Sequence, residues 1–183
     1  MNPFKRFAKS FLRKRHSRGF GVHSPYAFKF VGDVIRPKNY GYYAYEAIND
    51  LPDLSPKIAR KAKWFIRLAV FLKTKRFVVS SPAPQALSLA ADALGIECRQ
   101  LKDDKSFGFR SGDFMVIESS TPNLDIIVKA LDSSVAVLAV NPDNSLRQFL
   151  SRPIQNGLLL EDKNKMLLIP RKEMAYVAYD INF

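Results

Sequence analysis

The chain has 183 residues, of which 47% are hydrophobic and 12% aromatic, a composition typical of globular rather than disordered proteins. It contains no apolar run of eighteen residues, so no membrane span is expected, and its single cysteine, Cys98, excludes an internal disulfide and a cysteine zinc site. The formal net charge is +12, and residues 1–32 hold eight Lys or Arg and no acid. We therefore expect a basic N-terminal arm on a nearly balanced domain. The N-terminus lacks the apolar core of a signal peptide, which argues against secretion. Its Arg-rich, acid-free and amphipathic sequence would also suit an organellar presequence, but the rest of the chain favours a cytoplasmic protein.

Residues 3–15 have the spacing of an amphipathic helix. One face is apolar and the other basic; the apolar residues are Phe4, Phe7, Ala8, Phe11 and Leu12. Such a helix could attach to an anionic membrane surface, which would make the protein peripheral to a membrane, or to the phosphate backbone of a nucleic acid. It could also pack on its own domain and leave a solvated basic face. The anionic partner, if there is one, is predicted to bind residues 5–18.

Two further helices are predicted before the first strand. His23, Ser24 and Pro25 form a helix start, with Ser24 as the cap, and Ser55 with Pro56 begins a helix that reaches about Lys73. Neither His16 nor His23 has a second histidine or a cysteine at metal-ligand spacing, so no zinc site is expected. The tyrosines at positions 40, 42, 43 and 45 could stack on a flat ligand or pack against the core.

The rest of the chain alternates apolar strands with helices. Strands are predicted at 77–80, 96–101, 113–118 and 135–140, and helices at 82–94, 123–131 and 143–151. Ser81 is expected to cap the helix at 82–94, Pro82 to take its first position, and Gly95 to end it. Lys163 and Asn164 predict a hairpin turn. This order predicts an α/β fold: a Rossmann-like, methyltransferase-type sheet, mostly parallel with antiparallel C-terminal strands. An N-terminal helical extension (1–55) would precede the domain (56–183).

Three segments carry a resemblance to a known family: GFGVHSPYAF, YYAYE, and IRLAVFL with the strand that follows it. With these the chain resembles a bacterial family of small class I S-adenosylmethionine-dependent methyltransferase-like proteins. In that family the first two motifs precede the cofactor domain, and the chain ends in a similar β-rich tail. The resemblance implies S-adenosylmethionine as the cofactor and the loop after the first strand as its binding site.

The chain departs from the family at that loop. The family has a glycine-rich EIGxxxGxxT pattern, whereas this chain has VVSSPAPQA, whose prolines and side chains narrow the space that glycine leaves open. By position, the resemblance assigns cofactor contacts to Ser80, Ser81, Ala83 and Asp103, with Asp104 beside the last. Of the family's later acids, Glu118 is retained, whereas Asn141 and Pro142 replace a pair and Asp143 follows. Glu118 and Asp143 are therefore the catalytic candidates, and no metal site is expected.

We predict a degenerate methyltransferase-like protein that does not bind S-adenosylmethionine in the usual way and acts in binding or assembly. One alternative is an active, O-methyltransferase-like enzyme of unknown substrate, in which Glu118 and Asp143 orient a nucleophile or a metal. A second alternative is a nucleic-acid-binding module that uses residues 5–18 and the basic surface of the helix at 57–73.

Overall fold

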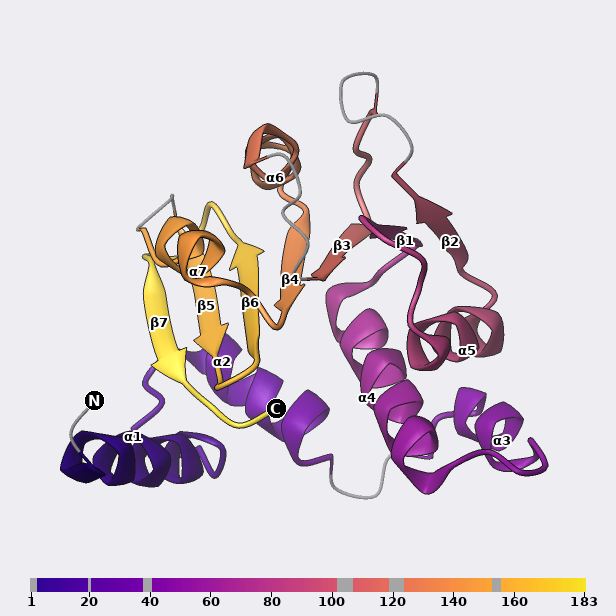
Figure 1. Ribbon diagram of the computed structural model, residues 1–183, viewed down its shortest axis with the longest axis horizontal. Coiled ribbons are helices and arrows are strands. Elements are labelled where there is room, and N and C mark those ends of the chain that lie inside the picture. Colours follow the sequence, from indigo (N-terminus) through magenta and orange to yellow (C-terminus); the bar gives the residue numbers. More distant parts are fainter. Residues whose placement is uncertain (1–2, 20, 38–40, 102–106, 119–123, 153–155) are drawn as a thin grey trace.

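The computed structural model describes residues 3–19, 21–37, 41–101, 107–118, 124–152 and 156–183, with residues 3–9 described by their backbone alone (Figure 1). The helices are α1 (Pro3–His16), α2 (Pro25–Phe30), the π-helix η1 (Val31–Ile35), α3 (Ala44–Asn49), α4 (Pro56–Leu72), α5 (Gln85–Leu94), α6 (Leu124–Asp132) and α7 (Asn144–Leu150). The strands are β1 (Arg76–Val79), β2 (Glu97–Gln100), β3 (Asp113–Glu118), β4 (Ala136–Val140), β5 (Gly157–Glu161), β6 (Lys165–Pro170) and β7 (Val177–Asp180).

The strands form one seven-stranded sheet in the order β2-β1-β3-β4-β6-β5-β7. The pairings show that β6 runs against the other six described strands, because it is antiparallel to both of its neighbours and all other pairs are parallel. The fold is therefore of the Rossmann-like α/β class, mostly parallel with an antiparallel C-terminal hairpin, as the sequence predicts. The hairpin turn lies at Lys163 and Asn164, between β5 and β6, also as predicted.

Helices cover both faces of the sheet, and each face has its own hydrophobic cluster. Figure 1 shows α6 and α7 on one side of the sheet and α2, α4 and α5 on the other. Side chains alternate between the two faces along each strand. In β3, Phe114 and Val116 therefore lie in the cluster covered by α2, α4 and α5, whereas Met115 and Ile117 lie in the cluster covered by α6 and α7. Burial on both faces explains why DFMVIE and AVLAV are continuous apolar runs.

The segment with the HSPY and YAYE motifs belongs to the same core as α4. Phe30, Val34 and Ile48 are buried in the cluster that also holds the inner face of α4. The Ser24 hydroxyl caps α2 by accepting from the Ala27 N–H, as predicted. The Tyr179 hydroxyl in β7 accepts from the backbone N–H of both His23 and Ser24. This motif therefore joins the N-terminal helices to the edge strand. Tyr40 lies outside the described residues.

The start of α5 differs from its sequence-based prediction. The helix begins at Gln85 rather than at position 82, and its N-cap is Pro84 instead of Ser81. The physical reason is Pro84 itself, because a proline disfavours helical backbone angles at the residue before it, here Ala83. Ser80, Ser81 and Pro82 form bends. The helix ends as predicted, with Gly95 in the left-handed conformation at φ +65°.

None of the described helices combines the length and apolarity that would let it cross a membrane.

Candidate functional site

A cleft of about 420 Å³ lies at the carboxyl edge of the parallel strands. Glu118 at the end of β3, Val140 at the end of β4, and Pro84 and Ala86 at the start of α5 line one part of it. Lys165 reaches the same edge because β6 is antiparallel and its first residue pairs with Val140. Ligands of open α/β sheets bind at this edge, and the volume is within the usual range of ligand pockets.

The wall of the cleft opposite these residues is one face of α4. Lys57, Arg60, Lys61 and Trp64 are spaced i, i+3, i+4 and i+7, which places them on a single stripe of the helix, and all four line the cleft. Lys57, Arg60 and Lys61 are exposed and form no ion pair with a described residue. Like charges at this spacing repel each other by roughly 0.2–0.5 kcal/mol per pair. The repulsion among these three cations destabilises α4 slightly, and a bound anion would relieve it.

Two further cations line the cleft, but they already have partners. Arg67 donates from Nε to the Val34 carbonyl at 2.8 Å and from Nη1 to the Tyr45 hydroxyl at 3.1 Å, and so ties η1 and α3 to α4. Lys165 donates to Asp162 at 3.2 Å and to the carbonyl of Phe183. Glu118 is the one acid among the described lining residues, and it has no ion-pair partner among them. The cleft is therefore strongly basic.

Aromatic residues also line the cleft, namely Trp64, Phe65 and Phe183. The ring of Trp64 stacks on that of Phe183 at 6.0 Å with an interplanar angle of 24°, and the Lys165 ammonium lies 5.6 Å from the Trp64 ring and 5.0 Å from the Phe183 ring. The Trp64 Nε1–H is buried and has no hydrogen-bond acceptor among the described residues. A buried indole N–H normally has a partner, so this donor is an unsatisfied polar group beside the cleft.

The two catalytic candidates occupy different environments. Glu118 lines the cleft and is half-buried. Asp143 is exposed, and its carboxylate accepts the Leu146 N–H at 2.7 Å as the N-cap of α7. Asp143 is not among the residues that line the cleft. Its observed contact is structural, since a cap of this kind satisfies an otherwise unpaired N–H at the helix start.

The cofactor-contact candidates lie around the bend after β1. The Ser80 N–H donates to the Val116 carbonyl at 3.2 Å, which places the bend beside β3, and the Ser80 hydroxyl is buried without a partner among the described residues. Ser81 is half-buried, and Ala83 packs against the core cluster. Of this loop and helix start, Pro84 and Ala86 line the cleft. Asp103 and Asp104 lie outside the described residues.

Sequence reasoning did not identify Trp64, Lys165 or Phe183 as site residues. One part of the site could have been recognised from the sequence, because three cations and an aromatic residue recur at helical spacing at Lys57, Arg60, Lys61 and Trp64. No local signal places Lys165 and Phe183 beside it, because their positions depend on the pairing of β6 with β4 and on the path of the chain after β7.

A second candidate surface is the N-terminal helix. α1 packs against β7 with polar groups: His16 Nδ1 donates to the Asp180 carbonyl at 2.8 Å, the Ser17 hydroxyl accepts from the Asn182 N–H at 2.8 Å, and Arg13 Nε lies 3.6 Å from the Asp180 carboxylate. The sequence left open that α1 packs on its own domain. It does so, and its described contacts with β7 and the residues after it are made by polar side chains.

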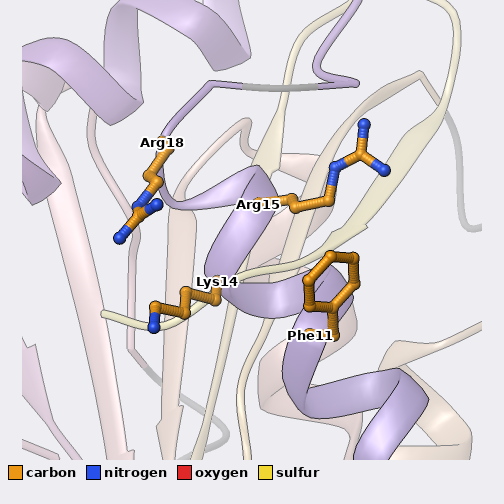
Figure 2. A pocket seen from close by; sticks show the side chains of 4 residues that line it. All are labelled: Phe11, Lys14, Arg15 and Arg18. Carbon is orange, nitrogen blue, oxygen red and sulfur yellow. The ribbon is translucent and has the colours of Figure 1, made fainter.

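The outer side of α1 is apolar and basic. Phe11 is 56% exposed and Leu12 44% exposed. Figure 2 shows Phe11 and Arg15 on one side of the helix ribbon and Lys14 and Arg18 on the other. These four residues line a surface hollow of about 340 Å³. The Arg15 guanidinium lies 5.9 Å from the Phe11 ring centroid. The side chains of Phe4, Phe7 and Ala8 lie outside the described part of the structure.

Neither histidine is placed for metal binding. His16 is hydrogen-bonded to the Asp180 carbonyl, and its ring makes an edge contact with the Tyr179 ring, with 5.6 Å between the two ring centroids. Within the described ranges, no group of three or more His, Cys, Asp or Glu side chains could hold a metal ion.

Comparisons with known proteins do not assign the chain to a family. No protein-family model matches it, and no curated protein matches it. Among solved structures it is similar to a crystal structure of a proposed aminotransferase from Burkholderia pseudomallei K96243, with 12% sequence identity and a TM-score of 0.32. That alignment covers 75% of this chain and 59% of the other chain.

Proposed function

We propose that this protein is a non-catalytic, methyltransferase-like binding protein that attaches to an anionic membrane surface through α1. The observation that carries the proposal is the orientation of α1, which contacts its own domain with Arg13, His16 and Ser17 and exposes Phe11 and Leu12. A helix that only covered its own core would bury its apolar residues and expose its charges. Among the described side chains of α1, Phe11 and Leu12 are exposed together with Lys14 and Arg15, and Arg13 and His16 make the contacts with the domain.

The charges around the exposed residues favour an anionic surface. Lys14, Arg15 and Arg18 are exposed, form no ion pair with a described residue, and surround the hollow at Phe11. Interfacial helices combine an apolar face that enters the lipid with cations that contact anionic headgroups. A nucleic-acid backbone would use the cations but would leave Phe11 and Leu12 exposed to water. The membrane is therefore the better match.

The loop after β1 supports the non-catalytic part of the proposal. Between Ser80 and Ala86 there is no glycine, and Pro84 with Ala86 faces the cleft. S-adenosylmethionine carries a sulfonium cation, whereas the cleft holds five Lys or Arg and one acid among its described lining residues. Like charge disfavours that ligand in a partly desolvated site. Glu118, the one retained acid, lines this cleft, whereas Asp143, which follows the replaced pair, does not.

Vesicle co-sedimentation tests the membrane attachment. The full chain is expected to bind vesicles of phosphatidylglycerol and phosphatidylcholine, to bind pure phosphatidylcholine weakly, and to lose binding as salt increases. The double variant F11S/L12S should reduce partitioning at least about tenfold, because each apolar side chain contributes roughly 1.5–3 kcal/mol when buried.

The matched control is L124S/V128S on α6, which removes two side chains of similar exposure, 37% and 41%. It should bind vesicles like the unmodified protein. Equal binding by F11S/L12S and the unmodified protein would contradict the proposal. Salt-sensitive DNA binding that K14Q/R15Q weakens and F11S/L12S does not, without vesicle binding, would favour the nucleic-acid alternative.

Calorimetry with S-adenosylmethionine and with S-adenosylhomocysteine tests the non-catalytic part separately. We expect neither to bind saturably nor to raise the melting temperature. Micromolar affinity for either compound would raise the melting temperature by mass action and would contradict the non-catalytic part of the proposal.

A further inference from the structure

We propose that the cleft between α4 and the carboxyl edge of the sheet binds a small organic anion with a planar ring, of the nucleotide class. This site is separate from the outer face of α1, and the inference does not depend on membrane attachment. It rests on three features of the described residues: unpaired cations in a row, an aromatic platform with an unused donor, and one acid placed at the end of a strand.

The cations supply the anionic half of the recognition. Lys57, Arg60 and Lys61 lie on one stripe of α4, line the cleft and have no ion-pair partner among the described residues. Arg67 and Lys165, in contrast, are held by hydrogen bonds to Val34, Tyr45, Asp162 and Phe183. Three cations on neighbouring turns match a phosphate or pyrophosphate group, whose oxygens accept several charge-assisted hydrogen bonds at once.

The aromatic half lies on the same stripe. Trp64 follows Lys61 by three residues and lines the cleft, so a ring bound against it would be within a few ångströms of the cations. One side of the indole is already braced, because Phe183 stacks on Trp64 and Phe65 packs edge-on at 4.9 Å. A platform fixed in this way loses little side-chain entropy when it stacks on a ligand ring. Its buried Nε1–H remains unpaired among the described residues.

Glu118 explains why the ligand should carry hydroxyl or amine groups as well as charge. It is the one acid among the described residues that line the cleft, and it has no ion-pair partner there. A carboxylate in a basic cleft does not favour a bare anion, but it accepts hydrogen bonds from a sugar hydroxyl or an exocyclic amine. Cations, a ring platform and a single acceptor together match a nucleotide better than phosphate alone or an uncharged nucleoside.

Trp64 is the single tryptophan of the chain, so its fluorescence reports directly on this cleft. Titration of the full protein with ADP should quench that emission saturably, and calorimetry should give the same affinity. Adenosine and inorganic pyrophosphate, each of which lacks one half of the ligand, should each bind about tenfold more weakly or worse. Added salt should weaken ADP binding and leave adenosine nearly unchanged.

The variant R60Q/K61Q should weaken ADP binding at least about tenfold, while the matched variant K14Q/R15Q, which removes two cations from α1, should bind ADP like the unmodified protein. All four positions are exposed, so both variants should fold, and equal melting temperatures confirm this. Failure of ADP to bind, equal affinity for pyrophosphate, or an unchanged affinity of R60Q/K61Q would overturn the inference. None of these outcomes bears on vesicle binding through α1.

Discussion

The Ser17 hydroxyl accepts a hydrogen bond from the Asn182 backbone N–H at 2.8 Å and donates one to the Arg13 carbonyl at 2.7 Å. This one side chain joins the end of the first helix to the end of the chain. Together with His16 it fixes which side of α1 faces the domain, and therefore which side faces outward.

Ser17→Ala should loosen α1 without unfolding the domain. The two hydrogen bonds contribute about 0.5–1.5 kcal/mol each, so amide exchange in α1 should accelerate roughly fivefold or more while exchange in the sheet stays unchanged. Ser10→Ala on the same helix is the control, since Ser10 is exposed and makes no hydrogen bond to a described residue. Identical exchange in the two variants would show that Ser17 does not hold α1.

The buried ion pair between Arg76 and Asp113 should be the most sensitive polar contact of the fold. Arg76 binds the carboxylate with two nitrogens at 2.9 and 2.6 Å, and the two side chains are only 7% and 2% exposed. Asp113→Asn leaves a buried guanidinium without its counter-charge and should cost about 3–5 kcal/mol, measured by urea unfolding.

Glu173→Gln provides the contrast, because the Arg171–Glu173 pair is at the surface. Its urea midpoint should hardly change. A small effect of Asp113→Asn, comparable with that of Glu173→Gln, would contradict the role given to the buried pair.

Gly157→Ala should destabilise the C-terminal hairpin. Gly157 has φ +151°, and a Cβ placed there would lie 2.5 Å from the Ile169 carbonyl oxygen on the paired strand. We expect a loss of about 3 kcal/mol in thermal or urea unfolding, because backbone must move to remove the clash. Gly32→Ala is the control: its Cβ meets nothing within 4 Å, and alanine should be neutral or stabilising there. Similar stability of the two variants would count against this hairpin geometry.

Tyr26 should make stability fall in alkaline solution. Burial raises the pKa of Tyr26 above its ordinary 10.0, although the hydrogen bond with Arg171 acts in the opposite direction. The folded state therefore holds the phenol proton more tightly than the unfolded state. The corresponding stability is complete below the unfolded pKa and is lost as pH rises through the folded one.

Tyr26→Phe removes this titration. Its unfolding free energy should fall less steeply above pH 10.0 than that of the unmodified protein, measured by urea titrations on both sides of that value. Tyr176 has a pKa raised by burial as well, so some slope should remain. An identical slope in the two proteins would show that Tyr26 does not contribute.

Most of the sheet could be predicted from the sequence because its signals are local. The apolar runs of β3 and β4 follow from burial on both faces, and Ser55 with Pro56 marks the start of α4. The predicted start of α5 was wrong by three residues, because Pro84 disfavours helical backbone angles at the residue before it and so delays the start of the helix to Gln85.

The functional surfaces were less accessible to sequence reasoning. The amphipathic pattern of α1 is clear, but a pattern does not say which side of the helix packs on the domain. That is decided by the hydrogen bonds that His16 donates to the Asp180 carbonyl and Ser17 accepts from the Asn182 N–H. In the cleft, Trp64 and Phe183 are far apart in sequence and meet only through the folded tail. Such long-range placements leave no periodic signal in the chain.

The most direct measurement of membrane attachment uses an environment-sensitive fluorophore at position 11. In a Cys98→Ser background, which removes the single cysteine, Phe11→Cys carries the label, and Val128→Cys on α6 carries it in the control. On addition of phosphatidylglycerol vesicles, the label at position 11 should shift its emission to the blue and brighten, while the label at position 128 stays as in water. Emission at position 11 that remains that of a water-exposed label would contradict insertion of this face of α1 into the lipid.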